Sequence, residues 1–128
     1  MVNTKLLDRW TLIHCGVGSL LTVSLWALKL NWWSVLVVAG LECLWEIFEN
    51  NDIGIKFWHY LNYNNYKGDS VAHTAIDFIL TSLSSALTAL IAYQYDFDTA
   101  LIASLSFSGA ALLLFVLFFL IESFKIFG

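Results

Sequence analysis

Four long apolar stretches occupy most of this chain, and acidic side chains are clustered inside two of them. Glu42 and Glu46 lie in the second stretch, and Asp77 lies in the third together with His73. None of the four interiors contains a lysine or an arginine. A charged carboxylate at the centre of a bilayer costs at least ~2.5 kcal/mol on insertion scales, so such residues usually face the interior of a bundle. These acids therefore need positive charge from protons or from a metal ion.

The composition predicts one integral membrane domain that covers residues 1–128. Hydrophobic residues make up 59% of the chain, charged residues only 12%, and the mean hydropathy is +0.75. Because a helix needs ~20 apolar residues to cross the hydrocarbon core, we expect an all-α, four-helix transmembrane bundle. The expected helices cover about residues 10–30, 31–48, 71–93 and 99–126, with a long cytoplasmic-side loop between the second and the third.

The basic residues predict the orientation of this bundle. The turn between the first and second helices and the turn between the third and fourth helices lie at one end of the expected bundle. Of the six basic residues, only Lys29 falls at this end. The other basic residues fall on the side of the termini and the long loop: Lys5, Arg9, Lys56, Lys67 and Lys125. Because basic segments stay on the cytoplasmic side, both termini are expected to be cytoplasmic.

The acidic residues are spaced so that they form two helical stripes. Glu42, Glu46 and Glu49 stand at i, i+4 and i+7, and Asp69, His73 and Asp77 stand at i, i+4 and i+8. If both stripes face the bundle axis, they line one space at the cytoplasmic end, which His14 of the first helix also reaches.

This pattern predicts a metal site. The expected ligands are Glu46, Glu49, Asp69, His73 and Asp77, because carboxylates with one or two imidazoles suit Mg, Mn, Zn or Fe. A divalent metal ion is therefore the expected cofactor, with its identity open, and Glu42 or His14 is the expected base. Protons shared between paired carboxylates are the main alternative. For two of the acids a purely structural role is the alternative, with Asp69 as a helix N-cap and Glu49 as a solvated acid.

Short motifs add a resemblance. Residues 8–10 (DRW) lead to His14, residues 45–50 read WEIFEN, and residues 66–70 read YKGDS. In this order the motifs, followed by Asp77, resemble a family of small bacterial inner-membrane proteins of undefined activity and, more distantly, the VanZ-like superfamily.

The resemblance covers about residues 8–80 and implies a multi-helix protein of the bacterial inner membrane, with polar residues clustered at the ends of adjacent helices. VanZ-like proteins are linked with resistance to glycopeptide antibiotics. The chain departs from the pattern at His73, where the resemblance leads us to expect an asparagine.

Three classes of function are compatible with these features. The first is an enzyme whose cation acts on a membrane lipid or a lipid-linked substrate. The second is a cation or proton conductor. The third is a structural or assembly subunit, in which small-residue faces dock a partner or a second copy to form a homo-oligomer. Nucleic-acid binding is excluded, because the net charge is -4 and the six basic residues form no patch.

Overall fold

The computed structural model describes residues 9–61 and 68–127, and this part of the chain is helical. Five helices follow one another along the chain: α1 (Arg9–Ala27), α2 (Trp33–Asn50), α3 (Asp52–Tyr60), α4 (Val71–Gln94) and α5 (Phe97–Phe127). The predicted all-α fold class is confirmed.

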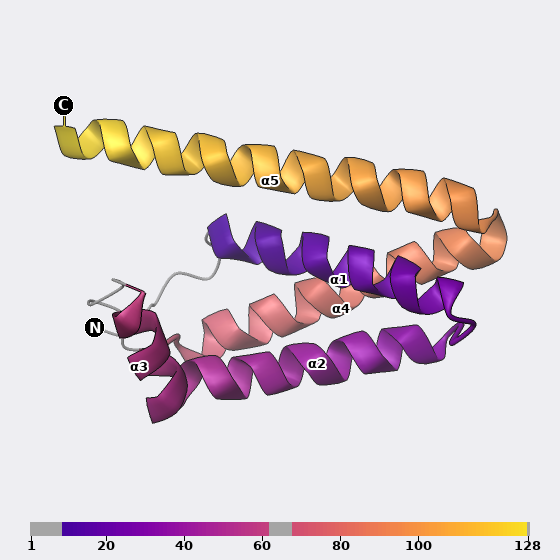
Figure 1. Ribbon diagram of the computed structural model, residues 1–128, viewed down its shortest axis with the longest axis horizontal. Coiled ribbons are helices and arrows are strands. Elements are labelled where there is room, and N and C mark those ends of the chain that lie inside the picture. Colours follow the sequence, from indigo (N-terminus) through magenta and orange to yellow (C-terminus); the bar gives the residue numbers. More distant parts are fainter. Residues whose placement is uncertain (1–8, 62–67, 128) are drawn as a thin grey trace.

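The four long helices run side by side, each antiparallel to the one before it (Figure 1). α1 has a central place, because it contacts α2, α4 and α5, while α4 also contacts α2 and α5. The turns α1–α2 and α4–α5 lie at one end of the bundle. The start of α1, the end of α2, the short helix α3 and the start of α4 lie at the other end. This second end carries the stripes of acidic residues.

Within the described residues, three helices are long and apolar enough to cross a membrane. They are α1 (Trp10–Ala27), α4 (Val71–Gln94) and α5 (Phe97–Glu122). α2 has the length of 18 residues but contains Glu42, Glu46 and Glu49, which lower its mean hydropathy. Three of the four predicted spans are therefore confirmed by length and composition, and a membrane-spanning role for α2 stays a prediction.

The predicted long loop is in part a helix. α3 fills residues 52–60, and its N-terminus is capped by Asn51, whose side chain accepts a hydrogen bond from Gly54 N at 2.9 Å. The corner between α2 and α3 is very tight, because a Cβ on Gly54 would lie 1.8 Å from Phe48 O. Residues 62–67 lie outside the described residues, and so do Asp8, Tyr66 and Lys67 of the short motifs.

The opposite end of the bundle closes with two turns. Lys29 (φ 69°) and Asn31 (φ 51°) adopt left-handed conformations, which let the chain reverse between α1 and α2 as the sequence predicted. Asp96 precedes α5 and accepts a hydrogen bond from Thr99 N at 2.6 Å. Hydrogen bonds from the side chain and the backbone of Thr99 lower the pKa of the Asp96 carboxyl. An apolar cluster of Val23, Ala92 and Ala100 packs between these turns.

Aromatic rings gather at both ends of the bundle, as expected for residues at a membrane interface. Trp58 lies 5.9 Å from Trp10 and 6.3 Å from Trp45 between ring centroids, at the end that carries the acids. Trp26, Trp32 and Tyr93 form the corresponding group at the other end. At the helical rise Trp10 and Trp26 are about 24 Å apart along α1, which is close to the thickness of a hydrocarbon core.

Hydroxyl groups join the helices in the half of the bundle beyond the acids. Ser19 of α1 lies 2.6 Å from Thr88 Oγ1 of α4 and donates to Ser104 Oγ of α5 at 3.0 Å. Thr22 and Ser85 form a second hydroxyl pair between α1 and α4. Small and hydroxyl side chains of this kind let helices approach closely in a bilayer.

Candidate functional site

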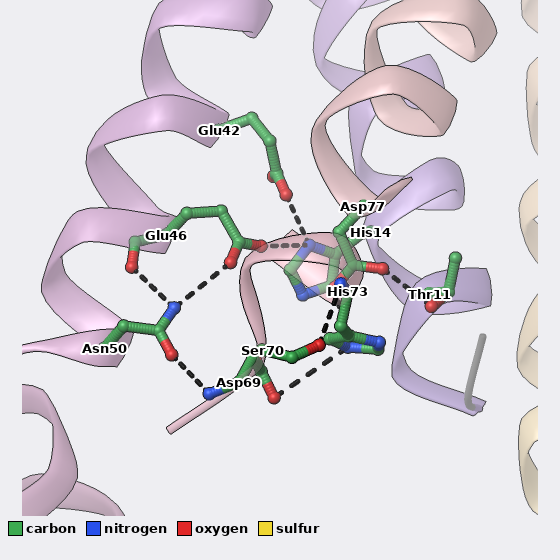
Figure 2. A network of polar contacts seen from close by, with 9 residues as sticks. All are labelled: Thr11, His14, Glu42, Glu46, Asn50, Asp69, Ser70, His73 and Asp77. Carbon is green, nitrogen blue, oxygen red and sulfur yellow. Dashed lines mark hydrogen bonds and ion pairs between the residues drawn. The ribbon is translucent and has the colours of Figure 1, made fainter. Parts of the chain in front are cut away.

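The first group of polar side chains, called the α1–α2 acid cluster below, consists of His14, Glu42, Glu46 and Glu49. Figure 2 shows His14, Glu42 and Glu46 of this cluster. His14 Nδ1 is hydrogen-bonded to Glu42 Oε1 at 2.6 Å and lies 3.6 Å from Glu46 Oε1. Within the described part of the chain, this imidazole is the only basic group that pairs with Glu42 or Glu46. Even with His14 protonated, three carboxylates would face a single positive charge.

Glu46 is the most enclosed acid of this cluster, with 3% of its surface exposed. Its Oε2 accepts a long hydrogen bond from Asn50 Nδ2 at 3.4 Å, while its Oε1 is buried without a hydrogen-bond partner among the described residues. A buried carboxylate oxygen that accepts no hydrogen bond costs several kcal/mol of desolvation unless a cation or a proton compensates it. In the described part of the chain its ion-pair partner is His14 Nδ1 at 3.6 Å, so a bound cation or a shared proton would complete its surroundings.

The second group, called the α4 cluster below, consists of Asp69, His73 and Asp77. His73 Nε2 lies 3.2 Å from Asp77 Oδ2 and 3.9 Å from Asp69 Oδ1. Asp77 also accepts a hydrogen bond at 2.7 Å from Thr11 Oγ1 of α1. His73 and Asp77 are each 1% exposed and lie inside the bundle, whereas Asp69 is partly buried.

The backbone before α4 positions the second group. Ser70 is the N-cap, because its Oγ accepts a hydrogen bond from His73 N at 3.1 Å, whereas the sequence offered Asp69 for this role. Gly68 has φ +98°, a left-handed conformation that favours glycine. Asp69 N donates to Asn50 Oδ1 at 2.6 Å. The end of α2 and the start of α4 are therefore joined directly.

The structure divides the predicted ligands between the two groups. Glu46 and Glu49 group with His14, and their ligand atoms lie within 4.8 Å of one another; Asp69, His73 and Asp77 form the other set with the same spread. Each set can hold one ion by its geometry alone. The residues of the two sets that Figure 2 draws face the same region between α1, α2 and the start of α4. Glu49 lies within electrostatic range of Asp69 and Asp77.

Two residues of this network are absent from the sequence-based site. Thr11 lies three positions before His14, so both side chains fall on one face of α1. Asn50 lies four positions after Glu46, and its Nδ2 also donates to Glu46 O at 2.9 Å. Their helical spacing was a usable signal, but threonine and asparagine are too common at such positions for the spacing to single them out.

A groove of about 340 Å³ opens between α1 and α2 beside the α1–α2 acid cluster. Its polar end is lined by His14, Glu42 and Glu49. The other lining residues are chiefly apolar and come from four helices: Trp10, Ile13, Val17, Gly18, Leu21, Val38, Leu41, Trp45, Trp58 and Thr81. The acids are therefore reached from a surface that is largely hydrophobic.

The chain was compared with family models, with curated proteins and with solved structures, and no match was found in any of the three. Functional conclusions therefore rest on the geometry and chemistry of the two groups. What the helices and these groups establish together is a protein with membrane-length apolar helices and a buried cluster of carboxylates and imidazoles.

Proposed function

We propose that this protein is an integral membrane protein that holds a divalent cation in the α1–α2 acid cluster and uses it to act on a lipid or a lipid-linked substrate. The observation that carries the proposal is Glu46 Oε1, a buried carboxylate oxygen with no hydrogen-bond partner in the described chain. It lies among further carboxylates and beside an imidazole, which together are the ligands that Mg, Mn, Zn and Fe accept.

The contacts of His14 suggest how the ligands are arranged. With Glu42 accepting a hydrogen bond from Nδ1, the other ring nitrogen of His14 is left for the cation. A carboxylate that fixes the ring of a metal-bound histidine in this way is a common feature of metal sites. We therefore assign His14, Glu46 and Glu49 as ligands, and Glu42 as the residue that orients His14 and accepts its proton.

The α4 cluster has a different place in the proposal. Its Asp77 already contacts His73 and Thr11, so the need for an external cation is weaker there. Asp69, His73 and Asp77 can nevertheless hold a second ion, since their ligand atoms lie within 4.8 Å of one another. A second cation would help to neutralise an anionic substrate between the two groups.

The chemistry follows from a cation in a low-dielectric site. Such an ion polarises a phosphoryl or carbonyl oxygen and lowers the pKa of a bound water, so that hydrolysis or group transfer becomes feasible near neutral pH. Lipids and lipid-linked phosphates are the substrates that reach a site among membrane-length helices. The distribution of the basic residues favours the cytoplasmic side for this site, and the resemblance of the short motifs favours the bacterial inner membrane.

Conduction of protons or cations is less well supported by the interior of the bundle. Beyond Asp77, several hydroxyl groups of α1, α4 and α5 are hydrogen-bonded to one another, as in Ser19 with Thr88 and Ser104. Past them lies the apolar cluster of Val23, Ala92 and Ala100, with Trp26 and Phe97 packed against it. An ion path would have to cross this apolar end, where nothing replaces the hydration of the ion.

The proposal is tested by measuring bound metal in detergent-purified protein by elemental analysis. We expect about one equivalent of a divalent metal or more in the wild type, and a loss of at least one equivalent in Glu46→Gln. The double variant Glu46→Gln/Asp77→Asn should hold none. Asp98→Asn, which changes an exposed acid at the opposite end of the bundle, is the matched control and should retain the wild-type content. A wild-type protein that binds no divalent metal, even after incubation with Mg, Mn, Zn or Fe, would contradict the proposal.

A further inference from the structure

We propose that the groove between α1 and α2 receives an acyl chain of a membrane phospholipid and so brings its phosphate group to the α1–α2 acid cluster. This inference deepens the proposed function, because it names the substrate class, and it rests on that function for the role of the acids. Four properties of the groove carry it: its lining, its polarity, its position relative to the aromatic rings, and its charge.

The two walls of the groove are apolar and accessible. Val17 and Leu21 stand at i and i+4 on α1, and Leu41 faces them from α2. Val17 is 48% exposed and Leu41 is 46% exposed, although both line a hollow of about 340 Å³. This volume falls within the ~300–1,000 Å³ range of ligand pockets. Because α1 is a membrane-length helix, hydrocarbon rather than water is the medium that meets these side chains.

The floor of the groove comes from a close approach of two helices. A Cβ on Gly18 of α1 would lie 2.7 Å from Thr81 Cγ2 of α4, so only glycine permits this contact. Thr81 Oγ1 is buried and has no hydrogen-bond partner among the described residues. We expect this hydroxyl to donate a hydrogen bond to an ester oxygen of a bound lipid.

The polarity of the groove follows the polarity of a phospholipid. Its apolar walls lead to His14, Glu42 and Glu49, and the rings of Trp10, Trp45 and Trp58 stand around this polar end. Tryptophan rings of this kind mark the level of lipid headgroups. A lipid whose chain lies along Leu21 and Leu41 therefore has its headgroup at the level of the acid cluster.

The charge of the cluster makes the prediction specific. Three carboxylates repel a phosphate, so a phospholipid can occupy the groove with its phosphate at the cluster only when a cation lies between them. A cation in the α1–α2 acid cluster supplies this link. An anionic phospholipid should therefore bind more tightly when the divalent metal is present.

The experiment uses the full chain in phosphatidylcholine nanodiscs that contain a small fraction of phosphatidylglycerol with a photoreactive diazirine on one acyl chain. We expect saturable labelling of peptides from α1 and α2 that unlabelled phosphatidylglycerol suppresses. Leu41→Trp, which fills the groove, should lower this labelling about tenfold. Leu44→Trp is the matched control, because Leu44 lies on the same helix outside the groove and is 64% exposed; its labelling should equal that of the wild type.

The bound metal is measured in the same samples, so that the two proposals can fail separately. The groove inference would be overturned, and the metal site left intact, by metal-loaded protein whose labelling is distributed evenly over all helices. Labelling of Leu41→Trp equal to that of the wild type would have the same meaning. Metal-free protein with saturable labelling of α1 and α2 would overturn the proposed function together with the cation link to the phosphate, and would support the groove as an acyl-chain site alone. Val17→Trp, which fills the groove from the opposite wall, should reproduce the effect of Leu41→Trp if that variant proves too unstable to purify.

Discussion

Asn50 Oδ1 accepts a hydrogen bond from the backbone N–H of Asp69 at 2.6 Å and thereby joins the end of α2 to the start of α4. The same side chain donates to Glu46 through its Nδ2. The side-chain amide of Asn50 therefore links the α1–α2 acid cluster to the α4 cluster. The relative position of the α1–α2 acid cluster and the α4 cluster depends on this residue.

Replacing Asn50 by leucine should weaken both the fold and the site. The change leaves the N–H of Asp69 and the carboxylate of Glu46 without these hydrogen bonds, which costs about 1–3 kcal/mol for buried groups. We expect a lower midpoint of thermal unfolding in detergent and weaker binding of the divalent metal. An Asn50→Leu protein with the unfolding midpoint and metal affinity of the wild type would show that the link has no energetic role.

The hydroxyl of Thr11 should matter for the α4 cluster. Thr11→Val removes the donor to Asp77 Oδ1 at nearly constant volume, so the expected loss of stability is about 1–3 kcal/mol. Thr11→Ser keeps a hydroxyl at this position and should lose less. Thermal unfolding of the three proteins in the same detergent checks the order. Equal unfolding of Thr11→Val and Thr11→Ser would mean that the methyl group, and not the hydroxyl, is what the position requires.

Gly40, inside α2, and Gly54, at the corner between α2 and α3, offer a matched pair of substitutions. In Gly54→Ala the new methyl group would collide with the backbone at Phe48 O, so the corner between α2 and α3 must move. Gly40 lies in the interior of α2, and a Cβ there would meet no atom within 4 Å. We expect Gly54→Ala to unfold at a lower temperature, whereas Gly40→Ala should be stabilised by about 0.5–1 kcal/mol through the higher helix propensity of alanine. Destabilisation of the same size in both would contradict the close contact at the corner.

Liposomes that contain the purified protein should show no flux of protons or metal cations above that of empty vesicles. The apolar cluster of Val23, Ala92 and Ala100 closes the end of the bundle opposite the acids, and this closure is the reason for the expectation. The flux is measured with an internal pH-sensitive dye after a pH jump. A protein-dependent proton flux that Asp77→Asn abolishes would favour the conductor over the enzyme.

Much of the fold was readable from the sequence, because apolar length and helical spacing are local properties. Three membrane-length helices follow from composition alone, and the i, i+4 spacing of His73 and Asp77 correctly places them on one face of α4, with Asp69 just before the N-cap. The corner at Gly54 was not readable, because it depends on how the end of α2 packs against α3. The spacing there is typical of a short helix and of an interfacial strand alike.

The pairing of side chains between helices was not predictable in the same way. Spacing fixes which residues share a stripe, but the rotation of α1 decides that His14 meets Glu42 and Glu46, while Thr11 meets Asp77. The single set of ligands expected from the sequence became two sets for this reason. The metal itself, its ligands and the catalytic role of any residue stay predictions.

The central claim is that a cation compensates the buried carboxylate of Glu46, and an ion-resolved density map of the protein prepared with Mn²⁺ tests it most directly. We predict an anomalous-scattering peak between His14, Glu46 and Glu49, about 2.0–2.3 Å from the ligand atoms, which is the usual range for divalent metals bound by oxygen and nitrogen. The peak should disappear in Glu46→Gln and persist in Asp98→Asn. A map without a peak at this position, in which Glu46 Oε1 instead contacts a neighbouring carboxyl group through a shared proton, would contradict the account.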